Sequence, residues 1–310
     1  MDIHGGNIRI KAAPDGTLLR IGHWPAPGAT RRVIRRVILC HGRTEFLEKY
    51  AETIAELHGR GYDVWSMDWR GQGLSGRTLT NPQKGHIDDF STYIGDLAWF
   101  MDRIAKDGPG EIAVRETILL GHSMGGHIVL RALLARRVTA DRVILTAPMI
   151  DLPMRRIGRA ATTILCRAAC LSGFGTRYLV GLGDYDPERV RFDGNPLTGD
   201  AERFAAIRAA IAANPGVEMG GPTFGWLNAA FRSIAKLRKL PEAKHPSCPV
   251  LVCTAMADTV VSVAAQNYLC ERMPTCTQIR IVGARHEILH ETNEIRRQFW
   301  AAFDGPAATG

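Results

Sequence analysis

The sequence of 310 residues lacks the features of fibrous, disordered and repeat proteins. It has no internal repeat and no low-complexity stretch, and its 32 Gly and 16 Pro are close to an average share. Hydrophobic residues make up 45% and charged residues 23% of the chain, as in ordinary globular proteins. Collagen, coiled coil and disorder are therefore excluded. The length fits either two domains or one large domain with an insertion.

Long apolar runs are also missing. The most apolar region, 118–134, carries two histidines and Arg131, and it falls short of the roughly 20 uncharged apolar residues that cross a bilayer. Residues 1–11 lack the basic start and the apolar run of a secretory signal. The sequence therefore predicts a protein that does not span a membrane and has a cytoplasmic location.

Cysteine occurs seven times, an odd number, and without a C-x-x-C pair. Several cysteines lie in apolar segments, so all are predicted to be reduced thiols that pack in the core. Cys166 and Cys170 share a helix face, but no further Cys or His is spaced to complete a metal site with them.

The net charge is +8, which fits attraction to nucleic acid, to anionic lipid or to an acidic substrate. However, 32 of the 39 basic residues are arginine, and alanine is abundant, which a GC-rich coding bias would also produce. Charge alone therefore assigns no partner, and nucleic acid is not among the predicted ones.

Short apolar runs alternate with helix-period segments through the first half of the chain. The runs, predicted to be strands, are 7–12, 17–24, 33–40, 63–68, 117–120 and 142–146. The first two flank Pro14-Asp15-Gly16 and predict a hairpin. Helical periodicity occupies 47–59, 90–104 and 125–135. Buried strands that alternate with helices predict a parallel sheet with right-handed crossovers.

The alternation stops at Asp151, and the pattern to about residue 245 is helical and irregular. Strand-like runs resume at 249–254 and 278–282, with helices near 263–272 and 291–303. The sequence therefore predicts an α/β fold with one mostly parallel, eight-stranded sheet. Residues 1–150 and 246–310 build this domain, and a helical cap at 151–245 interrupts it.

The strongest local signal is Gly121-His122-Ser123-Met124-Gly125, a G-x-S-x-G between a predicted strand and a predicted helix. A serine on such a tight turn has a strained backbone, and the glycines let the chain fold back without a Cβ clash. The helix N-terminus also favours negative charge that develops there. Ser123 is therefore the predicted nucleophile, and a small-residue turn is the alternative.

A serine hydroxyl needs a base to take its proton, and the base needs an acid to fix its tautomer. Asp258 and His286 each follow a predicted strand, at the sheet edge where Ser123 also lies. They are the predicted acid and base. Two alternatives remain open: Asp258 as no more than a helix N-cap, and Asp151 as the acid.

Residues 286–290 read H-E-x-x-H, which binds zinc when it lies on a helix. Here the motif follows a strand and a glycine turn, and only twenty residues remain to supply a third ligand. No metal and no other cofactor is predicted, and His290 has no assigned role. The Gly-rich segment 68–75 lacks the third Gly and the P-loop Lys of a phosphate site, so we interpret it as structural.

Together these motifs resemble the α/β-hydrolase superfamily, in particular its branch of monoacylglycerol lipases and bacterial lysophospholipases. The resemblance covers nearly the whole chain. Its matching segments are HGRTEFLEKY at 41–50, DWRGQGLSGR at 68–77, GHSMGG at 121–126, APM at 147–149 and GARHEILHE at 283–291. Within the predicted cap, NPLT at 195–198 and GPTFGW at 221–226 are more similar to the lysophospholipases.

The resemblance implies Ser123 as nucleophile, Asp258 as acid and His286 as base. It also implies the backbone N–H groups of Arg43 and Met124 as donors of an oxyanion hole. Many relatives have a small residue at the position of Arg43. The long side chain there either crowds the site or contacts a substrate phosphate.

A predicted helix at 154–171 is amphipathic and basic. Its apolar residues share one face and are Ile157, Ala161, Ile164, Leu165, Ala168 and Leu171. Residues 151–245 contain 14 Arg or Lys against 9 Asp or Glu, a net +5. Such a helix either packs its apolar face on the sheet domain over the active site or lies on an anionic lipid surface, and both hold if the cap opens.

The sequence thus predicts a cofactor-independent serine hydrolase that cleaves the carboxylic ester of a single-chain lipid, with lysophospholipid as the first choice. A monoacylglycerol lipase, a general carboxylesterase and a peptidase of the same superfamily are the alternatives that share the triad. A non-catalytic binding protein on this fold would usually lack a triad member. The predicted partners are a small-molecule lipid ester and, through the basic cap, an anionic membrane surface. The surface in question is the inner face of the membrane.

Overall fold

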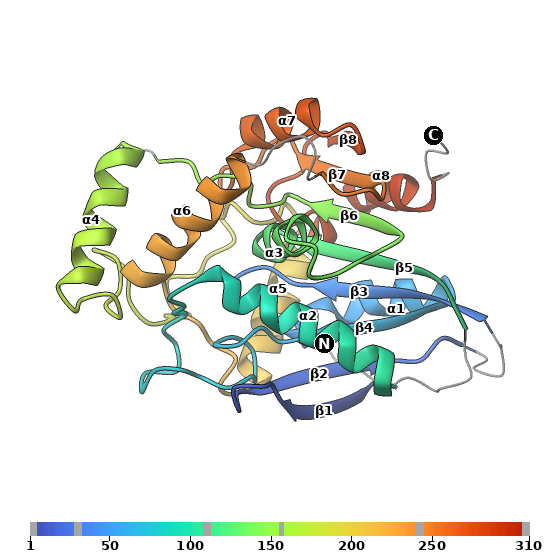
Figure 1. Ribbon diagram of the computed structural model, residues 1–310, viewed down its shortest axis with the longest axis horizontal. Coiled ribbons are helices and arrows are strands. Elements are labelled where there is room, and N and C mark those ends of the chain that lie inside the picture. The colour runs from blue at the N-terminus through green and yellow to red at the C-terminus, as the bar shows by residue number, and fades with distance from the viewer. Residues whose placement is uncertain (1–4, 28–32, 108–112, 155–157, 240–244, 306–310) are drawn as a thin grey trace.

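The structure is a computed structural model that describes residues 5–27, 33–107, 113–154, 158–239 and 245–305 (Figure 1). Its eight strands form one sheet in the order β1-β2-β4-β3-β5-β6-β7-β8. The strands are β1 Asn7–Ala12, β2 Leu18–Trp24, β3 Val33–Cys40, β4 Tyr62–Met67, β5 Ala113–His122, β6 Arg142–Thr146, β7 Val250–Ala255 and β8 Cys276–Ile281. The first two pair antiparallel, β2 pairs antiparallel with β4, and the remaining pairs are parallel. The predicted fold class is confirmed.

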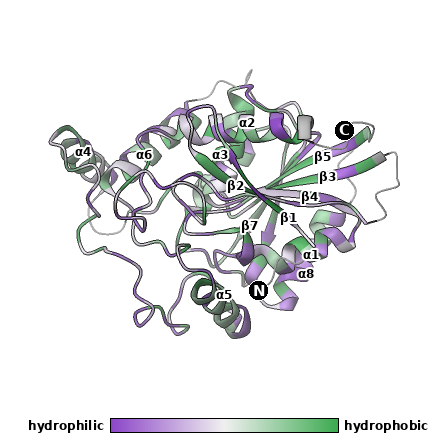
Figure 2. Ribbon diagram, turned by 90° about the horizontal axis from the view of Figure 1, so that it is seen from below, coloured by the Kyte–Doolittle hydropathy of each residue, from purple (hydrophilic) through white to green (hydrophobic). Residues whose placement is uncertain are grey.

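Helices cover both faces of the sheet. They are the short 3-10 helix η1 Leu47–Tyr50 with α1 Ala51–Gly59, α2 Phe90–Asp107, α3 Met124–Leu134, α7 Val263–Arg272, η3 Ile288–His290 and α8 Asn293–Asp304. In Figure 2, α1 and α8 lie on one side of the sheet, and α2 and α3 lie on the other. This double cover explains why the central strands are apolar on both faces, as Ile118, Leu119 and Leu120 of β5 are fully buried.

Between β6 and β7 lie three further helices, α4 Arg159–Leu171, α5 Ala201–Ala213 and α6 Phe224–Arg238. Among the described residues, the segment 151–245 adds no strand to the sheet. Figure 1 shows α4 at the outer end of this segment, beside α6 and away from the strands. No helix within the described ranges has both the length and the apolar character needed to cross a bilayer.

The sequence left two orientations open for the apolar face of α4, on the sheet domain or on a lipid surface, and the structure does not show the first. Its predicted apolar face does not pack on the sheet domain, because Ile164, Leu165 and Leu171 are 69%, 45% and 79% exposed. The helix packs against α6 instead, with Cys166 buried on the inner side. The periodicity located the apolar face correctly, but the contact with α6 uses the smaller side chains of the opposite face. Ile157, also assigned to the apolar face, lies outside the described residues.

The prediction of seven reduced cysteines is wrong for one pair, since Cys270 and Cys276 form a disulfide. The turn from α7 into β8 brings their Cα atoms to 5.1 Å, within the range that a disulfide bridges. The other five are free, and Cys40, Cys166 and Cys253 are buried as expected. Strand ends also differ by a few residues, mainly because β5 begins at Ala113, where it pairs with the start of β3.

Candidate active site

Ser123 lies on the sharp turn between β5 and α3. Its φ of 49° and ψ of −115° are strained for a residue with a Cβ, which indicates that the surrounding structure holds the turn in place. Only glycine fits on either side. A Cβ at Gly125 would lie 2.1 Å from the Cys40 carbonyl oxygen, and one at Gly121 would lie 2.7 Å from the Cα of Gly126. The motif therefore reflects close packing of α3 against both β3 and β5.

The structure brings the predicted acid and base to this serine. His286 Nε2 lies 2.9 Å from Ser123 Oγ, and its Nδ1 lies 2.7 Å from Asp258 Oδ2. The other oxygen of Asp258 accepts the backbone N–H groups of Val260 and Val261 at 2.7 and 3.0 Å. All three side chains are buried, so each of these bonds is shielded from water. The arrangement can deprotonate a serine and stabilise the imidazolium that results.

Asp151, the alternative acid, does not contact His286. Its carboxylate pairs with Arg159 and lies 3.4 Å from Arg238. The geometry thus favours Asp258 as the partner of the imidazole.

The loop after β3 supplies the predicted oxyanion donors. Neighbouring N–H groups on this loop are engaged: Gly42 donates to the Glu45 carboxylate, and Thr44 donates to Gln72 Oε1 at 2.7 Å. The N–H groups of Arg43 and Met124 have no acceptor within the described part of the chain. Both residues line the cavity that contains Ser123 and His286. Two unengaged donors beside the nucleophile are what an oxyanion hole requires.

The Arg43 side chain leaves this loop toward the segment 151–245. Its Nη2 donates to the Gly220 carbonyl oxygen at 3.0 Å, and its guanidinium lies 5.1 Å from the ring centroid of Trp226. Burial lowers its pKa to about 10. Its Nε is buried and has no partner among the described residues.

Sequence reasoning missed a buried ionic network behind the site. Lys49 Nζ donates to Glu45 at 2.7 Å and to Glu287 at 2.6 Å, and Tyr50 Oη donates to Glu45 at 2.7 Å. Burial disfavours the Lys49 charge, but the carboxylates of Glu287 and Glu45 outweigh burial and raise its pKa. Burial raises the pKa of Glu287, whereas the charge of Lys49 holds that of Glu45 below its usual range. Because Glu45 also accepts the Gly42 N–H, the network fixes the oxyanion loop.

The H-E-x-x-H motif divides between this network and the triad. His290 Nε2 lies 2.9 Å from the Lys49 carbonyl oxygen, while His286 faces Ser123. The two imidazoles thus have different partners, and no group of three potential metal ligands occurs among the described residues.

The Gly-rich segment 68–75 contains the buried carboxylate of Asp68, which accepts the N–H groups of Leu47 and Leu74.

Two adjoining cavities lie at this sheet edge. The cavity at Ser123 has a volume of about 170 Å³, and its neighbour has a volume of about 210 Å³. Both have Thr44, Leu197 and Glu287 in their walls. The segment around Leu197 also holds the base, since the N–H groups of His286 and Glu287 donate to the carbonyl oxygens of Pro196 and Leu197.

Comparisons with known proteins agree with this geometry. A family model described as serine aminopeptidase, S33, matches residues 31–293. Lysophospholipase L2 of Escherichia coli K12 is 33% identical over 269 residues, which cover 84% of this chain and 77% of the relative. A probable lysophospholipase L2 of Haemophilus influenzae is 29% identical over 266 residues, covering 86% and 81%.

Solved structures share the fold at low sequence identity. A monoglyceride lipase from Saccharomyces cerevisiae aligns with a TM-score of 0.70 at 20% identity, covering 98% of this chain and 96% of that one. A carboxyl esterase from Bacillus coagulans aligns with a TM-score of 0.71 at 17% identity, covering 96% of each chain. These likenesses show the fold alone.

Proposed function

The chain belongs to the S33 serine aminopeptidase family of α/β hydrolases, and on this premise we propose that it is a lysophospholipase acting through Ser123, His286 and Asp258. The predicted family and the predicted enzyme class, a serine ester hydrolase, are confirmed by the family match and the relatives. One observation carries the substrate proposal. The hydrogen-bonded series from Asp258 to Ser123 ends in a cavity that adjoins a larger apolar one.

In the proposed mechanism, His286 Nε2 takes the proton of Ser123 as its Oγ attacks the acyl carbonyl carbon. Asp258 keeps the Nδ1 proton in place and stabilises the imidazolium. The N–H groups of Arg43 and Met124 bind the oxyanion, and loss of one such donor typically costs about 10²–10³ in turnover. His286 then protonates the departing alcohol, and a water molecule activated by the same base releases the fatty acid.

The apolar cavity supports a long acyl chain. It lies against α5, and its apolar lining includes Phe46, Phe204, Ile207, Ile211, Val217 and Met219. Apolar walls with a few polar groups at one end are typical of sites that bind alkyl chains. Glu287 and Thr44 stand at the junction with the Ser123 cavity, so the ester of a bound chain would be directed to the nucleophile.

Arg43 supports a phosphate-bearing head group. Arg43 lines the catalytic cavity, and its buried Nε, which has no acceptor among the described residues, is a donor that a phosphate oxygen could satisfy. Replacement of Arg43 by alanine keeps the backbone N–H. We therefore expect it to impair turnover of lysophospholipid more than turnover of monoacylglycerol. Equal losses on both would remove the phosphate contact from the proposal.

We further propose that residues 151–245 form a cap over a core of 1–150 and 246–310, and that α4 contacts an anionic membrane surface. Ile164, Leu165 and Leu171 are exposed on the outermost helix of the segment, and Arg167 is exposed beside them. The segment holds 14 basic against 9 acidic residues. Exposed apolar side chains with basic neighbours suit the boundary of an anionic bilayer. A location at the inner membrane face is part of this proposal.

The test is a substrate panel of lysophosphatidylcholine, lysophosphatidylethanolamine, monoacylglycerol and short p-nitrophenyl esters. We expect the highest kcat/KM on the lysophospholipids. A clear preference for monoacylglycerol would make the protein a monoacylglycerol lipase. A strong preference for the short esters would remove the lipid substrate and leave a general carboxylesterase.

A further inference from the structure

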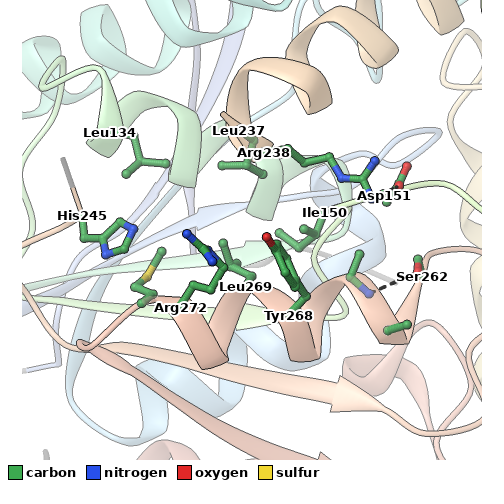
Figure 3. A pocket seen from close by; sticks show the side chains of 13 residues that line it. Leu134, Ile150, Asp151, Leu237, Arg238, His245, Ser262, Tyr268, Leu269 and Arg272 are labelled. Atoms are coloured by element: carbon green, nitrogen blue, oxygen red, sulfur yellow. Dashed lines mark hydrogen bonds and ion pairs between the residues drawn. The ribbon is translucent and has the colours of Figure 1, made fainter. Parts of the chain in front are cut away.

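A cavity of about 280 Å³ lies outside the proposed mechanism, between the C-terminal ends of α3 and α6 and the helix α7 (Figure 3). It contains neither Ser123 nor His286. Its floor is apolar and includes Leu134, Ile150, Leu237, Leu269 and Met273. The volume is close to the lower end of the roughly 300–1,000 Å³ that is typical of ligand pockets. Such a floor suits an alkyl chain.

The rim of this cavity is rich in hydrogen-bond donors. Figure 3 shows the side chains of Arg238, His245 and Arg272 among those that line the cavity. Arg272 lies with its guanidinium 5.5 Å from the ring centroid of Tyr268. His245 Nδ1 is buried and lacks a hydrogen-bond partner among the described residues.

Among the described residues that line the cavity, Asp151 supplies the one carboxylate, and two arginines already engage it. Arg159 pairs with one oxygen, and Arg238 lies 3.4 Å from the other. The ends of α6 and α7 carry partial negative charge, about half an elementary charge each, which the full charges of Arg238 and Arg272 outweigh. The rim therefore favours a ligand whose head group accepts hydrogen bonds and is negatively charged.

The cavity shares a wall with the catalytic one. Ile150, Asp151 and Ser262 face this cavity, whereas their sequence neighbours line the cavity at Ser123, namely Met149, Leu152, Val260 and Val261. The Ser262 N–H donates to the Asp151 carbonyl oxygen at 2.9 Å and joins the two segments of the wall. The same wall carries the N–H groups that hold the Asp258 carboxylate. An occupant would thus contact the support of the triad without entering the active site.

We propose that this cavity binds a single-chain fatty carboxylate, with the chain on the apolar floor and the head group among Arg238, His245 and Arg272. The choice of a fatty acid rests on the proposed function, which releases one. Because the site is separate from Ser123, the bound acid adds a noncompetitive component to product inhibition.

The test is calorimetric titration of the whole 310-residue chain with decanoate, below the concentration at which decanoate forms micelles. Two variants change the cavity. Ala264→Trp fills it from an exposed position on α7, and Arg272→Gln removes one rim charge. We expect Ala264→Trp to eliminate one decanoate site and Arg272→Gln to weaken that site roughly tenfold. Arg272→Lys should recover part of the affinity.

The matched control is Ile207→Trp, which narrows the cavity beside α5 and should leave the site at α7 intact. Decanol and decyltrimethylammonium should bind this site at least tenfold more weakly than decanoate. The noncompetitive component of inhibition should disappear in Ala264→Trp. Thermal unfolding of each variant verifies that the fold is kept.

Unchanged decanoate binding in both Ala264→Trp and Arg272→Gln would overturn the proposal, as would equal binding of the cationic decyl compound. Tenfold tighter binding of decyl phosphate would overturn the choice of a carboxylate. The outcomes for the proposed function are separate. If the wild type binds decanoate and Ala264→Trp loses that site, but the wild type hydrolyses no lipid ester, the site is kept and the lysophospholipase is refuted.

Discussion

The catalytic edge of the sheet and the helix α4 differ in the side chains that they bury. The edge buries polar and charged side chains, whereas α4 exposes apolar ones. At the edge, Ser123 and His286 are only 8% and 4% exposed, and Lys49 is buried between two carboxylates. On α4, Ile164 and Leu171 are 69% and 79% exposed. Residue polarity therefore does not decide burial in either region. The proposed function gives each region a task, chemistry at the edge and contact with a membrane on α4.

The energetic terms differ accordingly. A buried ion pair stabilises the fold only when each of its charges has a partner. Removal of one partner at the edge should therefore lower the free energy of unfolding strongly. Burial of an exposed apolar side chain on α4 would contribute about 25 cal/mol for each Å² removed from water, and the folded protein lacks this contribution. Replacement of such a side chain leaves no buried charge without a partner. Substitutions at the edge should therefore have large effects on activity or stability, whereas those on α4 should change only contact with a membrane.

The largest expected effect follows from Ser123→Ala. Without the hydroxyl no acyl-enzyme forms, and kcat should fall by about 10³–10⁶. Labelling by a fluorophosphonate should disappear, while the unfolding midpoint should change little. Ser233→Ala is the control, because Ser233 lies away from the triad. Its Oγ lies 2.7 Å from His127 Nε2, within hydrogen-bond distance. It should lose about 1 kcal/mol of stability and keep labelling. Undiminished labelling of Ser123→Ala would refute the assignment.

Lys49→Met tests the buried side of the comparison. It leaves Glu45 and Glu287 without their shared cation, so the free energy of unfolding should fall by about 3–5 kcal/mol. Urea denaturation followed by circular dichroism measures this change. Lys236→Met, at an exposed position of α6, should stay within about 0.5 kcal/mol of the wild type. A loss below 1 kcal/mol at Lys49 would show that the network does not stabilise the edge.

The sequence predicted the parts of this edge that depend on local pattern. The alternation of strand and helix patterns predicted the sheet, and the G-x-S-x-G turn predicted Ser123. Asp258 and His286 were predicted because each follows a strand, now seen as β7 and β8. The Lys49 network could not be predicted. Glu45 and Lys49 are four residues apart and read as an ordinary helix pair, whereas Glu287 is separated from Lys49 by 238 positions.

Other misses have the same origin. The amphipathic pattern of α4 gave an apolar face but no partner, since periodicity does not say what a face meets. The disulfide between Cys270 and Cys276 depends on a turn whose geometry the spacing alone does not fix. In both cases the pattern of residue types did not contain the geometry that decides the contact.

A smaller effect is expected from His127, which is fully buried in α3. Burial lowers its pKa from the ordinary 6.5 to about 3, so it stays neutral in the folded protein at moderately acid pH. The unfolded chain binds the proton below pH 6.5, and stability is lost as the pH falls toward 3. Between pH 7.5 and 5.5 the loss due to this residue should be about 1.4 kcal/mol.

Comparison of His127→Gln with the wild type isolates this loss. Glutamine does not titrate and keeps polar atoms for Met149 and Ser233, the partners of the imidazole. The stability difference between the two proteins should shrink by about 1.4 kcal/mol when urea titrations at pH 7.5 are repeated at pH 5.5. A constant difference would mean that His127 does not resist protonation.

The smallest effect is expected on α4, from the triple change Ile164→Ser, Leu165→Ser and Leu171→Ser. Because these side chains are already exposed, stability and turnover of a short soluble ester should not change. Activity on anionic vesicles containing lysophospholipid should fall about fivefold, or about 1 kcal/mol, since less apolar surface enters the bilayer boundary. Arg167→Gln should give a smaller loss that vanishes at high salt. Equal rates of the triple variant and the wild type on vesicles would refute membrane contact through α4 and leave its exposed apolar face for another partner.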